Sequence, residues 1–270
     1  GVSLVHAHYG YVGAVARTQW KVPVVLTYHG DDAMGTVTEA GVTSRKSRVI
    51  AAGCRQLARY CDAVIVQSRQ MAERFHSGNV HVIPHEVDFD TFHPSDKAAA
   101  RAELGLSGEK RYVLFAANPA IAVKRFPLAK AAVDRMKAAR TELELLVVHK
   151  EQQPRLALYM SACDALVFPS YQEGSPNIVK QAMACNLPIV ATDVGDVREV
   201  IGGTAGCYVC EPSAEVFAWR LEEILSNPFR TNGRQAVQHL SGPMVAQRII
   251  GLYEKVLRGR NVHELSTQEV

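Results

Sequence analysis

Short apolar runs rich in valine, isoleucine and leucine recur along the whole chain and alternate with longer amphipathic stretches. Nine such runs are present, at residues 3–8, 22–28, 63–67, 80–84, 112–116, 143–149, 165–168, 188–191 and 206–210. Runs that are apolar throughout, rather than at every second position, are typical of strands buried on both faces of a parallel sheet. The alternation therefore predicts a doubly wound α/β fold.

The helix-like stretches complete this pattern and suggest how it divides. They lie at residues 44–60, 97–104, 126–139, 179–184, 214–225 and 244–257. A polar stretch at residues 84–97 separates four strands from five, which predicts two Rossmann-like domains: residues 1–94, then 95–244, followed by a C-terminal helix and tail at 245–270. Four strands are fewer than the six of a Rossmann unit, so we expect the first domain to be incomplete.

Composition excludes several classes of protein. The 30 basic and 27 acidic residues are dispersed and give a net charge of only +3, which argues against nucleic-acid binding. No apolar run approaches the roughly 18 residues of a membrane span, and the start of the chain does not resemble a secretory signal. The six cysteines lie in apolar or helical contexts, which favours reduced thiols. We therefore expect a cytoplasmic protein.

Peripheral contact with the inner face of the membrane is an alternative to a purely cytoplasmic location. One predicted helix carries four basic residues, Arg45, Lys46, Arg48 and Arg55. Such a helix could meet anionic lipid heads, although an ordinary solvated face is the simpler explanation.

Three short patterns could hold a metal ion, and each also has a structural explanation. His6 and His8 share a strand face, Asp88 and Asp90 form a D-x-D triplet, and Cys207 and Cys210 form an isolated CxxC. The two histidines have no matching acid nearby, and the CxxC has no second pair and no neighbouring histidine. We expect no metal and no cofactor.

The segment "EGSPNIVKQAMACNLPIVATDVGDVREVI", residues 173–201, follows the end of a predicted strand. Pro176 suits the first turn of a helix, where its missing N–H costs nothing. The exposed N–H groups of Asn177, Ile178 and Val179 could then hold an anion such as a diphosphate. The alternative is that Glu173 and Ser175 merely cap the helix.

This segment closely resembles the nucleotide-recognition segment of retaining glycosyltransferases of family four, also called glycosyl transferases group 1, which have the GT-B fold. Further landmarks follow in the family's order: "LVHAHYGYVG", "VPVVLTYHGDD", "CDAVIVQS", "HVIPHEVDFDTFHP", "RYVLFAAN", "KRFPLAKAAV" and "MSACDALVFPS". The resemblance covers nearly the whole chain. It also implies that the family's first strands would precede Gly1, which would leave an open edge at residues 2–8 that a loop or a second copy in a homodimer could cover.

The resemblance assigns roles to individual residues. It implies catalytic roles for Glu173 beneath the donor sugar, Lys124 beside the leaving diphosphate and His29 near the donor sugar. It implies donor binding by Arg125, Gly174, Ser175, Pro176, Asn177, Ile178, Val179 and Gln181. From the residues alone, Lys124 and Arg125 could be a solvated pair, and His29 a satisfied polar residue at a strand end. Asp31 and Asp32 could cap a helix, orient His29 or face water.

Taken together, the resemblance implies a retaining hexosyltransferase that moves a sugar from a nucleotide-diphosphate donor to an acceptor hydroxyl. The chain departs from the family where Gln181 replaces a glutamate, where no arginine lies near Asn118, and where His85-Glu86 replaces Asn-Gly. The alternative is therefore a weak or inactive remnant that binds nucleotide or a partner protein. A nucleotide-sugar epimerase with the same fold is a third possibility.

Overall fold

The computed structural model describes residues 1–38, 42–137 and 140–267, and within them the chain forms two compact units. The first unit contains residues 1–37, 42–85 and the C-terminal helix from residue 242, and the second contains residues 86–241. These boundaries differ from those expected from the sequence, which lie after residues 94 and 244 and leave the last helix apart. In the structure that helix belongs with the first unit. The predicted helix at 126–139 ends at Lys137, and residues 138–139 lie outside the described residues.

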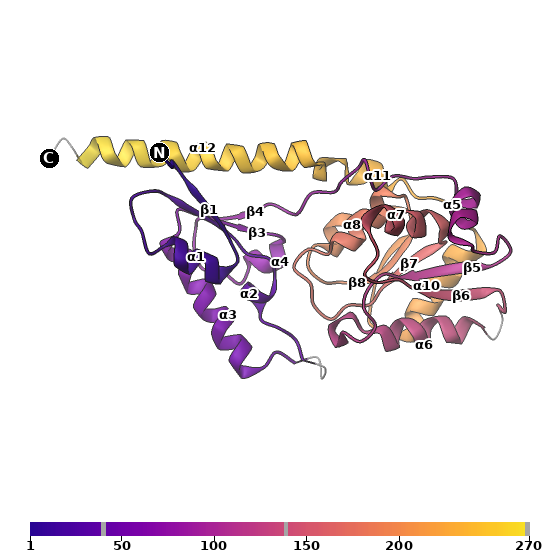
Figure 1. Cartoon of the computed structure of the whole chain (residues 1–270). Coiled ribbons are helices and arrows are strands. Elements are labelled where there is room, and N and C mark those ends of the chain that lie inside the picture. Colours follow the sequence, from indigo (N-terminus) through magenta and orange to yellow (C-terminus); the bar gives the residue numbers. More distant parts are fainter. Residues whose placement is uncertain (39–41, 138–139, 268–270) are drawn as a thin grey trace. The chain divides into compact units, whose positions relative to one another are not determined.

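The first unit is built on a parallel sheet of four strands in the order β1-β2-β3-β4. The strands are β1 (Val5–His8), β2 (Val24–Thr27), β3 (Ala63–Val66) and β4 (Val80–Val82). Figure 1 labels β1, β3 and β4. The two central strands, β2 and β3, are buried at every position, as expected for strands covered on both faces. Within the described residues β1 forms one edge of this sheet.

Helices cover both faces of this first sheet. One face carries α1 (Gly10–Ala16), α2 (Asp31–Met34), α3 (Arg45–Leu57) with η1 (Ala58–Tyr60), and α4 (Arg69–Ala72), whose buried side chains pack on Ala7, Val24 and Leu26. The other face carries α12 (Gly242–Thr267), whose Val245 and Leu252 pack on Val25 and Ile65. The C-terminal helix therefore completes the core of the first unit.

The second unit has a parallel sheet of five strands in the order β6-β5-β7-β8-β9. The strands are β5 (Arg111–Phe115), β6 (Leu143–Val147), β7 (Ala165–Phe168), β8 (Ile189–Thr192) and β9 (Cys207–Cys210). All nine predicted strands are therefore present, and both sheets are parallel as predicted. Cys207 and Cys210 pack in hydrophobic clusters on opposite faces of the sheet, which supports the structural explanation of the CxxC.

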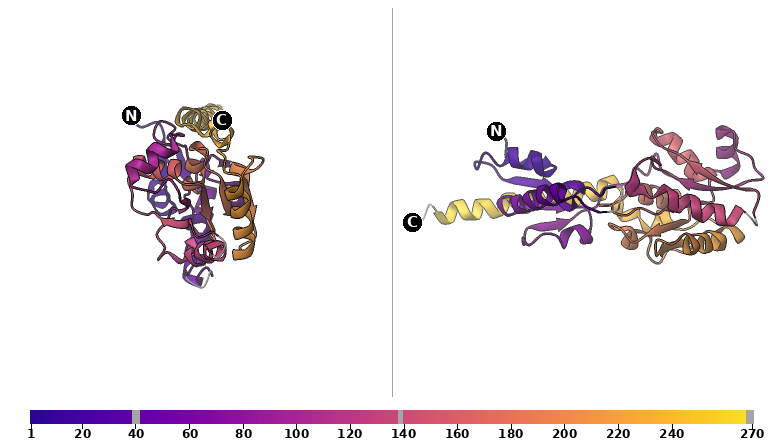
Figure 2. Two further views of the ribbon diagram at one scale, coloured as in Figure 1. Left: turned by 90° about the vertical axis from the view of Figure 1, so that its right-hand side faces the viewer. Right: turned by 90° about the horizontal axis from the view of Figure 1, so that it is seen from below.

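Helices also cover both faces of the second sheet, as Figures 1 and 2 show. One face is packed by α7 (Gln153–Ala162), α8 (Asn177–Ala184) and α9 (Val197–Ile201), and the other by α6 (Phe126–Lys137) and α10 (Ala214–Ser226). The shorter elements are α5 (Lys97–Leu104), η2 (Ala122–Lys124), α11 (Gly233–Ala236) and η3 (Gln238–Leu240). Both sheets thus have helices on both faces, as strands that are apolar on both sides require.

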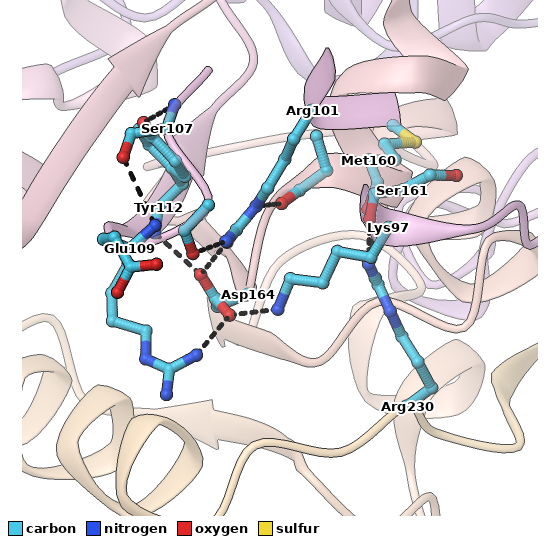
Figure 3. A network of polar contacts seen from close by, with 12 residues as sticks. Lys97, Arg101, Ser107, Glu109, Tyr112, Met160, Ser161, Asp164 and Arg230 are labelled. Carbon is cyan, nitrogen blue, oxygen red and sulfur yellow. Dashed lines mark hydrogen bonds and ion pairs between the residues drawn. The ribbon is translucent and has the colours of Figure 1, made fainter. Parts of the chain in front are cut away.

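A buried carboxylate fixes α5 to the sheet of the second unit (Figure 3). Asp164, which precedes β7, has a side chain only 1% exposed. It accepts hydrogen bonds from Lys97, from Arg101 at 3.0 Å and from the Tyr112 backbone N–H at 2.7 Å. These groups lie at the amino ends of β5 and β7, so this network holds the fold together at the end opposite the strands' carboxyl ends.

The strand order of the second sheet also locates a binding site. The chain moves from β5 to β6 on one side and then to β7 on the other side of β5. Ligands of open α/β sheets bind outside the carboxyl ends of the strands at such a change of direction. The loops after β5 and β7 are therefore the expected walls of a site.

Candidate functional site

Lys124 and Glu173 come from the two loops that flank this change of direction. Lys124 ends η2 in the connection after β5, and Glu173 lies in the loop after β7. Their Nζ and Oε1 atoms are 2.6 Å apart, and their side chains are 27% and 15% exposed. The Tyr171 N–H also donates to the Val123 carbonyl at 2.8 Å, which ties the two loops together. The structure therefore brings together two of the three residues predicted to be catalytic.

Arg125 adds a second cation beside this pair. Its backbone has φ 52° and ψ 44°, in the left-handed region that a non-glycine residue seldom adopts. Its guanidinium carbon lies 3.9 Å from the centre of the Tyr171 ring. Stacking on the ring fixes the plane of the guanidinium and leaves its N–H groups directed around the ring edge.

The loop from Glu173 leads into α8, whose start differs slightly from the prediction. Pro176 occupies the N-cap position and the helix begins at Asn177. Val179 donates its N–H to the Pro176 carbonyl at 3.2 Å, so the expectation that this group is available to an anion was wrong. The N–H groups of Asn177 and Ile178 have no acceptor among the described residues. These two donors and the helix dipole remain for an anion.

Gln181 lies one helical turn after Asn177, so both residues occupy the same side of α8. Gln181 is partly exposed and Asn177 is exposed. Among the remaining predicted donor residues, Gly174 and Pro176 are buried, and Ser175 and Ile178 are partly exposed. The predicted donor residues thus form a continuous segment from the loop into the first two turns of α8.

Lys180 and Asp196 form a buried ion pair behind this segment that the sequence analysis did not identify. Lys180 Nζ lies 3.4 Å from Asp196 Oδ2, and the two side chains are 0% and 3% exposed. Ser175 donates its hydroxyl to Asp196 Oδ2 at 2.6 Å, and Lys180 also contacts the Ser175 oxygen. Burial lowers the pKa of Lys180 and raises that of Asp196, and each partner offsets part of this change.

The turn that carries Asp196 is packed tightly against the loop of Glu173. Gly195 has φ 60°, and a Cβ at this position would lie 2.7 Å from the Gly174 carbonyl oxygen. Only glycine satisfies both conditions. The glycine within "DVGD" was the sequence signal for this close approach, and together with Lys180 and Asp196 it fixes the backbone from Glu173 to Ser175.

In the first unit, His29 lies at the carboxyl end of β2 in a row of imidazoles. His8 Nδ1 and His29 Nε2 are 3.0 Å apart, and His29 Nδ1 and His85 Nε2 are 3.3 Å apart. The Tyr9 ring packs on His29 with centroids 4.4 Å apart. Both ring nitrogens of His29 are therefore engaged, so one must be released before His29 can hydrogen-bond to a ligand.

The Asp32 carboxylate fixes the backbone beside this row of imidazoles. Its Oδ1 atom accepts the N–H groups of His29 at 3.0 Å and Gly30 at 3.1 Å, and its Oδ2 atom accepts that of Gly10 at 3.1 Å. Asp32 thus orients the His29 backbone, which was one of the three alternatives left open. Burial, followed by the neighbouring His8, lowers the pKa of His29. The neutral imidazole is therefore favoured.

The three candidate metal patterns have structural explanations. His6 bonds Tyr253 Oη through Nδ1 and Thr27 Oγ1 through Nε2, at 2.5 and 2.7 Å. Asp88 Oδ1 accepts two backbone N–H groups in its own turn. Throughout the described part of the chain, no three histidine, cysteine or acidic side chains are grouped so that they could hold a metal ion.

A cavity of about 440 Å³ lies beside the imidazole row. It shares Tyr9 and Asp32 with the surroundings of His29, and its lining is Tyr9, Tyr11, Asp31, Asp32, Thr36, Ser44, Lys46, Ser47 and Ile50. This size is within the range of small-molecule sites, and the mixture of two aromatic rings with carboxylates and hydroxyls suits a polyhydroxylated ligand.

In the structure, α3 contains the four basic residues considered for lipid contact. The guanidinium of Arg55 donates to the Ala33 carbonyl instead of extending into solvent. No helix among the described residues combines the length and the apolar character needed to cross a membrane.

Comparison with known proteins agrees with the division of the chain into two α/β units. Residues 1–91 match Glycosyltransferase Family 4, and residues 111–227 match Glycosyl transferases group 1. A D-inositol 3-phosphate glycosyltransferase of Mycobacterium sp. (strain KMS) is 30% identical over an alignment of 271 positions that covers 87% of this chain. The chain spans only 62% of the length of that relative.

Solved structures support the fold. Sucrose-phosphate synthase from Thermosynechococcus elongatus superposes with a TM-score of 0.77 at 23% identity, covering 96% of this chain and 75% of that one. Anabaena Alr3699/HepE in complex with UDP gives a TM-score of 0.73 at 16% identity, covering 94% and 79%. Both sheets, the site at the carboxyl ends of β5 and β7 and the two family matches lead to one assignment: the chain belongs to the GT-B glycosyltransferases of family 4.

Proposed function

We propose that this protein transfers a hexose from a nucleoside-diphosphate sugar to an acceptor hydroxyl with retention of configuration. The observation that carries the proposal is the Lys124–Glu173 pair at the change of direction in the second sheet. It joins a cation suited to a diphosphate with a carboxylate suited to sugar hydroxyls, next to the free N–H groups that begin α8.

In the proposed reaction, the bond between the sugar's anomeric carbon and the diphosphate oxygen breaks while the acceptor oxygen bonds to the same face of that carbon. The acceptor proton passes to the departing diphosphate. Lys124 and Arg125 stabilise the negative charge that develops there, because a positioned cation in a partly buried site acts most strongly on the charge of the transition state. Glu173 accepts hydrogen bonds from the sugar hydroxyls and holds the sugar in place.

The proposal assigns charge neutralisation to these side chains rather than to a metal ion. Turnover should therefore be unchanged by EDTA at concentrations that remove divalent ions. Loss of activity that returned only on adding Mg²⁺ or Mn²⁺ would contradict this assignment.

We assign the acceptor to the cavity beside His29. Tyr9 both stacks on His29 and lines the cavity, which links the predicted catalytic imidazole to this binding volume. The Mycobacterium relative is named a D-inositol 3-phosphate glycosyltransferase, so inositol and its phosphates are the first acceptors to test. We place the protein in the cytoplasm, because its six cysteines are all free thiols.

Thermal unfolding with UDP, GDP and ADP and their hexose conjugates tests donor binding. UDP comes first because it is bound in the HepE structure. A ligand at about 100 times its Kd should stabilise the protein by about 2.7 kcal/mol. Lys124→Ala and Glu173→Ala should reduce the stabilisation, whereas Lys110→Ala, an exposed lysine paired with Glu144, should not.

A nucleotide-binding protein without turnover is the second candidate. It is favoured by Gln181, which offers a ribose diol only a neutral acceptor, and by the lack of a cation among residues 117–121. The enzyme and the binding protein are distinguished by whether nucleoside diphosphate is released from the donor. If nucleotide binds but neither the wild type nor Gln181→Glu releases it, the protein is a binding protein; if Gln181→Glu raises the rate, it is a weakened enzyme.

A further inference from the structure

A small cavity between α3 and the segment that follows α4 is lined by cationic side chains. Its volume is about 150 Å³. The lining comes from two stretches of chain, Ala52, Arg55, Gln56 and Arg59 from α3 and η1, and Arg74, Phe75, His76 and Ser77 from the segment after α4. Three arginines and one histidine are therefore part of the lining, and no acidic residue is.

Elsewhere in the described chain, arginines commonly meet a carboxylate. Arg140 pairs with Glu222 at 2.6 Å, Arg198 with Asp193 at 2.6 Å and Arg101 with Asp164 at 3.0 Å. Within the same described residues, neither Arg59 nor Arg74 has a carboxylate within ion-pair distance, and Arg55 bonds only the Ala33 carbonyl. Like charges grouped in this way repel one another unless an anion lies between them.

Stabilisation of a helix end explains only part of this cluster. Arg55 and Arg59 lie at the carboxyl end of α3 and in η1, where a cation interacts favourably with the helix dipole. Arg74 and His76 belong to a separate, non-helical segment and have no such role. Phe75 lies between them and packs against Tyr28 of the core with ring centroids 4.9 Å apart, which holds this segment beside α3.

From this geometry we infer a binding site for a single phosphoryl group, as inorganic phosphate or a phosphomonoester. A guanidinium offers two parallel N–H donors that match a pair of phosphate oxygens, and the charges of Arg59 and Arg74 together can neutralise a dianion. The cavity has room for about five water molecules at ~30 Å³ each, enough for a phosphate group but too small for a whole nucleotide. The rest of a phosphomonoester would extend into solvent.

The phosphoryl site is distinct from the sites of the proposed sugar transfer. Its lining shares no residue with the cavity beside His29. The Lys124–Glu173 pair belongs to the other unit. Phosphate binding can therefore be tested whether or not the protein transfers a sugar.

Binding is measured by isothermal titration with inorganic phosphate and with glycerol 3-phosphate, in chloride buffers of constant ionic strength. Saturable binding at one site per chain is expected. Arg59→Gln and Arg74→Gln should each raise the Kd at least tenfold. Arg45→Gln is the matched control, because Arg45 lies on the same helix outside the cavity and its replacement removes the same charge.

Binding to vesicles shows whether the phosphoryl group belongs to a lipid or to a soluble compound. Flotation with vesicles of phosphatidylcholine containing phosphatidic acid presents the same group on a lipid. If Arg74→Gln abolishes binding to the vesicles while the soluble phosphates bind weakly, the site takes a lipid phosphomonoester; if the soluble ligands bind and the vesicles do not, it takes a free metabolite. The inference is overturned if neither binds, or if Arg45→Gln weakens binding as much as Arg59→Gln and Arg74→Gln do.

Discussion

The side chains at the carboxyl edges of the two sheets differ in their chemistry. In the first unit the groups at this edge are imidazoles, His8, His29 and His85, that bond to one another. In the second unit they are opposite charges, Lys124 with Glu173 and Lys180 with Asp196. Two sheets with the same parallel architecture thus place imidazole rings at one site and ion pairs at the other.

This difference predicts that the two units respond to different changes, one to the removal of a charge and the other to pH. Lysine and carboxylate side chains ordinarily titrate far from neutral pH, whereas imidazole titrates near it. We therefore expect the second unit to respond chiefly to removal of a charge and the first chiefly to pH. The four predictions below test this contrast from the largest effect to the smallest.

Breaking the buried pair of the second unit should have the largest effect. Asp196→Ala removes the carboxylate that pairs with the Lys180 ammonium at a position that is 0% exposed. Removing one partner of a buried ion pair costs about 3–5 kcal/mol. Urea unfolding measured by circular dichroism would show this as a lower free energy of unfolding.

The control for this prediction removes both charges. The double variant Lys180→Met with Asp196→Ala no longer buries an ammonium that has lost its closest carboxylate, so it should recover a large part of the lost stability. A loss below about 1 kcal/mol in Asp196→Ala, or a double variant as unstable as the single one, would show that the pair does not hold this part of the fold.

Removing the cation of the proposed transfer site should come next. Lys124→Ala should lower kcat by roughly 100-fold to 1,000-fold, the usual cost of losing one group that stabilises transition-state charge. Arg125→Ala is the matched comparison: the Arg125 guanidinium is stacked on Tyr171 rather than paired with Glu173, so its loss should cost less. Equal rates for Lys124→Ala and the wild type would remove Lys124 from the mechanism.

Acidification should weaken the first unit. Burial, with His8 and then His29 as lesser causes, lowers the pKa of His6 from 6.5 to about 4. The unfolded chain therefore binds protons at a pH where the folded chain does not, so protonation favours unfolding. The stability contributed by neutral His6 is complete above pH 6.5 and is lost as the pH falls from 6.5 to about 4. His29, whose pKa is also lowered, acts in the same direction.

Variants identify which ring is responsible. His6 faces Tyr253 of α12 and His8 of its own strand, and His29 faces Asp32, which partly opposes the lowering of its pKa. Melting temperatures of the wild type, His6→Gln and His29→Gln are compared between pH 7.5 and pH 5. Both variants should show a smaller decrease on acidification. An unchanged decrease in both would place the acid sensitivity elsewhere.

The central strands of both sheets could be predicted from the sequence because they are apolar at nearly every position. β2, β3, β7 and β8 are buried throughout, and their only polar residues are the threonines that end β2 and β8. Several helices were harder to recognise. α1 is a seven-residue helix that contains two glycines and exposes Tyr11 and Val12, so its residues show neither helix propensity nor a clear apolar face.

The site could be predicted only where local sequence determines it. The loop from Glu173 into α8 is contiguous, and its role followed from the resemblance. Contacts between residues distant in sequence could not be predicted, such as Lys124 with Glu173 and His29 with His85. Lys180 lies in a helix that looks ordinarily amphipathic, and only the approach of the Gly195 turn shows why it is buried with Asp196.

The smallest effect is expected for a variant that introduces a negative charge at position 181 of the second unit. Gln181→Glu places a carboxylate on the face of α8 that also carries Asn177, next to the predicted nucleotide. A hydrogen bond to a charged acceptor is worth about 1 kcal/mol more than one to a neutral acceptor, so the Kd for the nucleotide should fall roughly fivefold. Gln181→Met, which has similar length and no acceptor, should raise the Kd instead. The acid sensitivity of the first unit should be the same in both variants, because no histidine is altered. If both variants bound nucleotide like the wild type, the ribose would not contact this face of α8, and the site would have to be placed nearer Lys124 and Arg125.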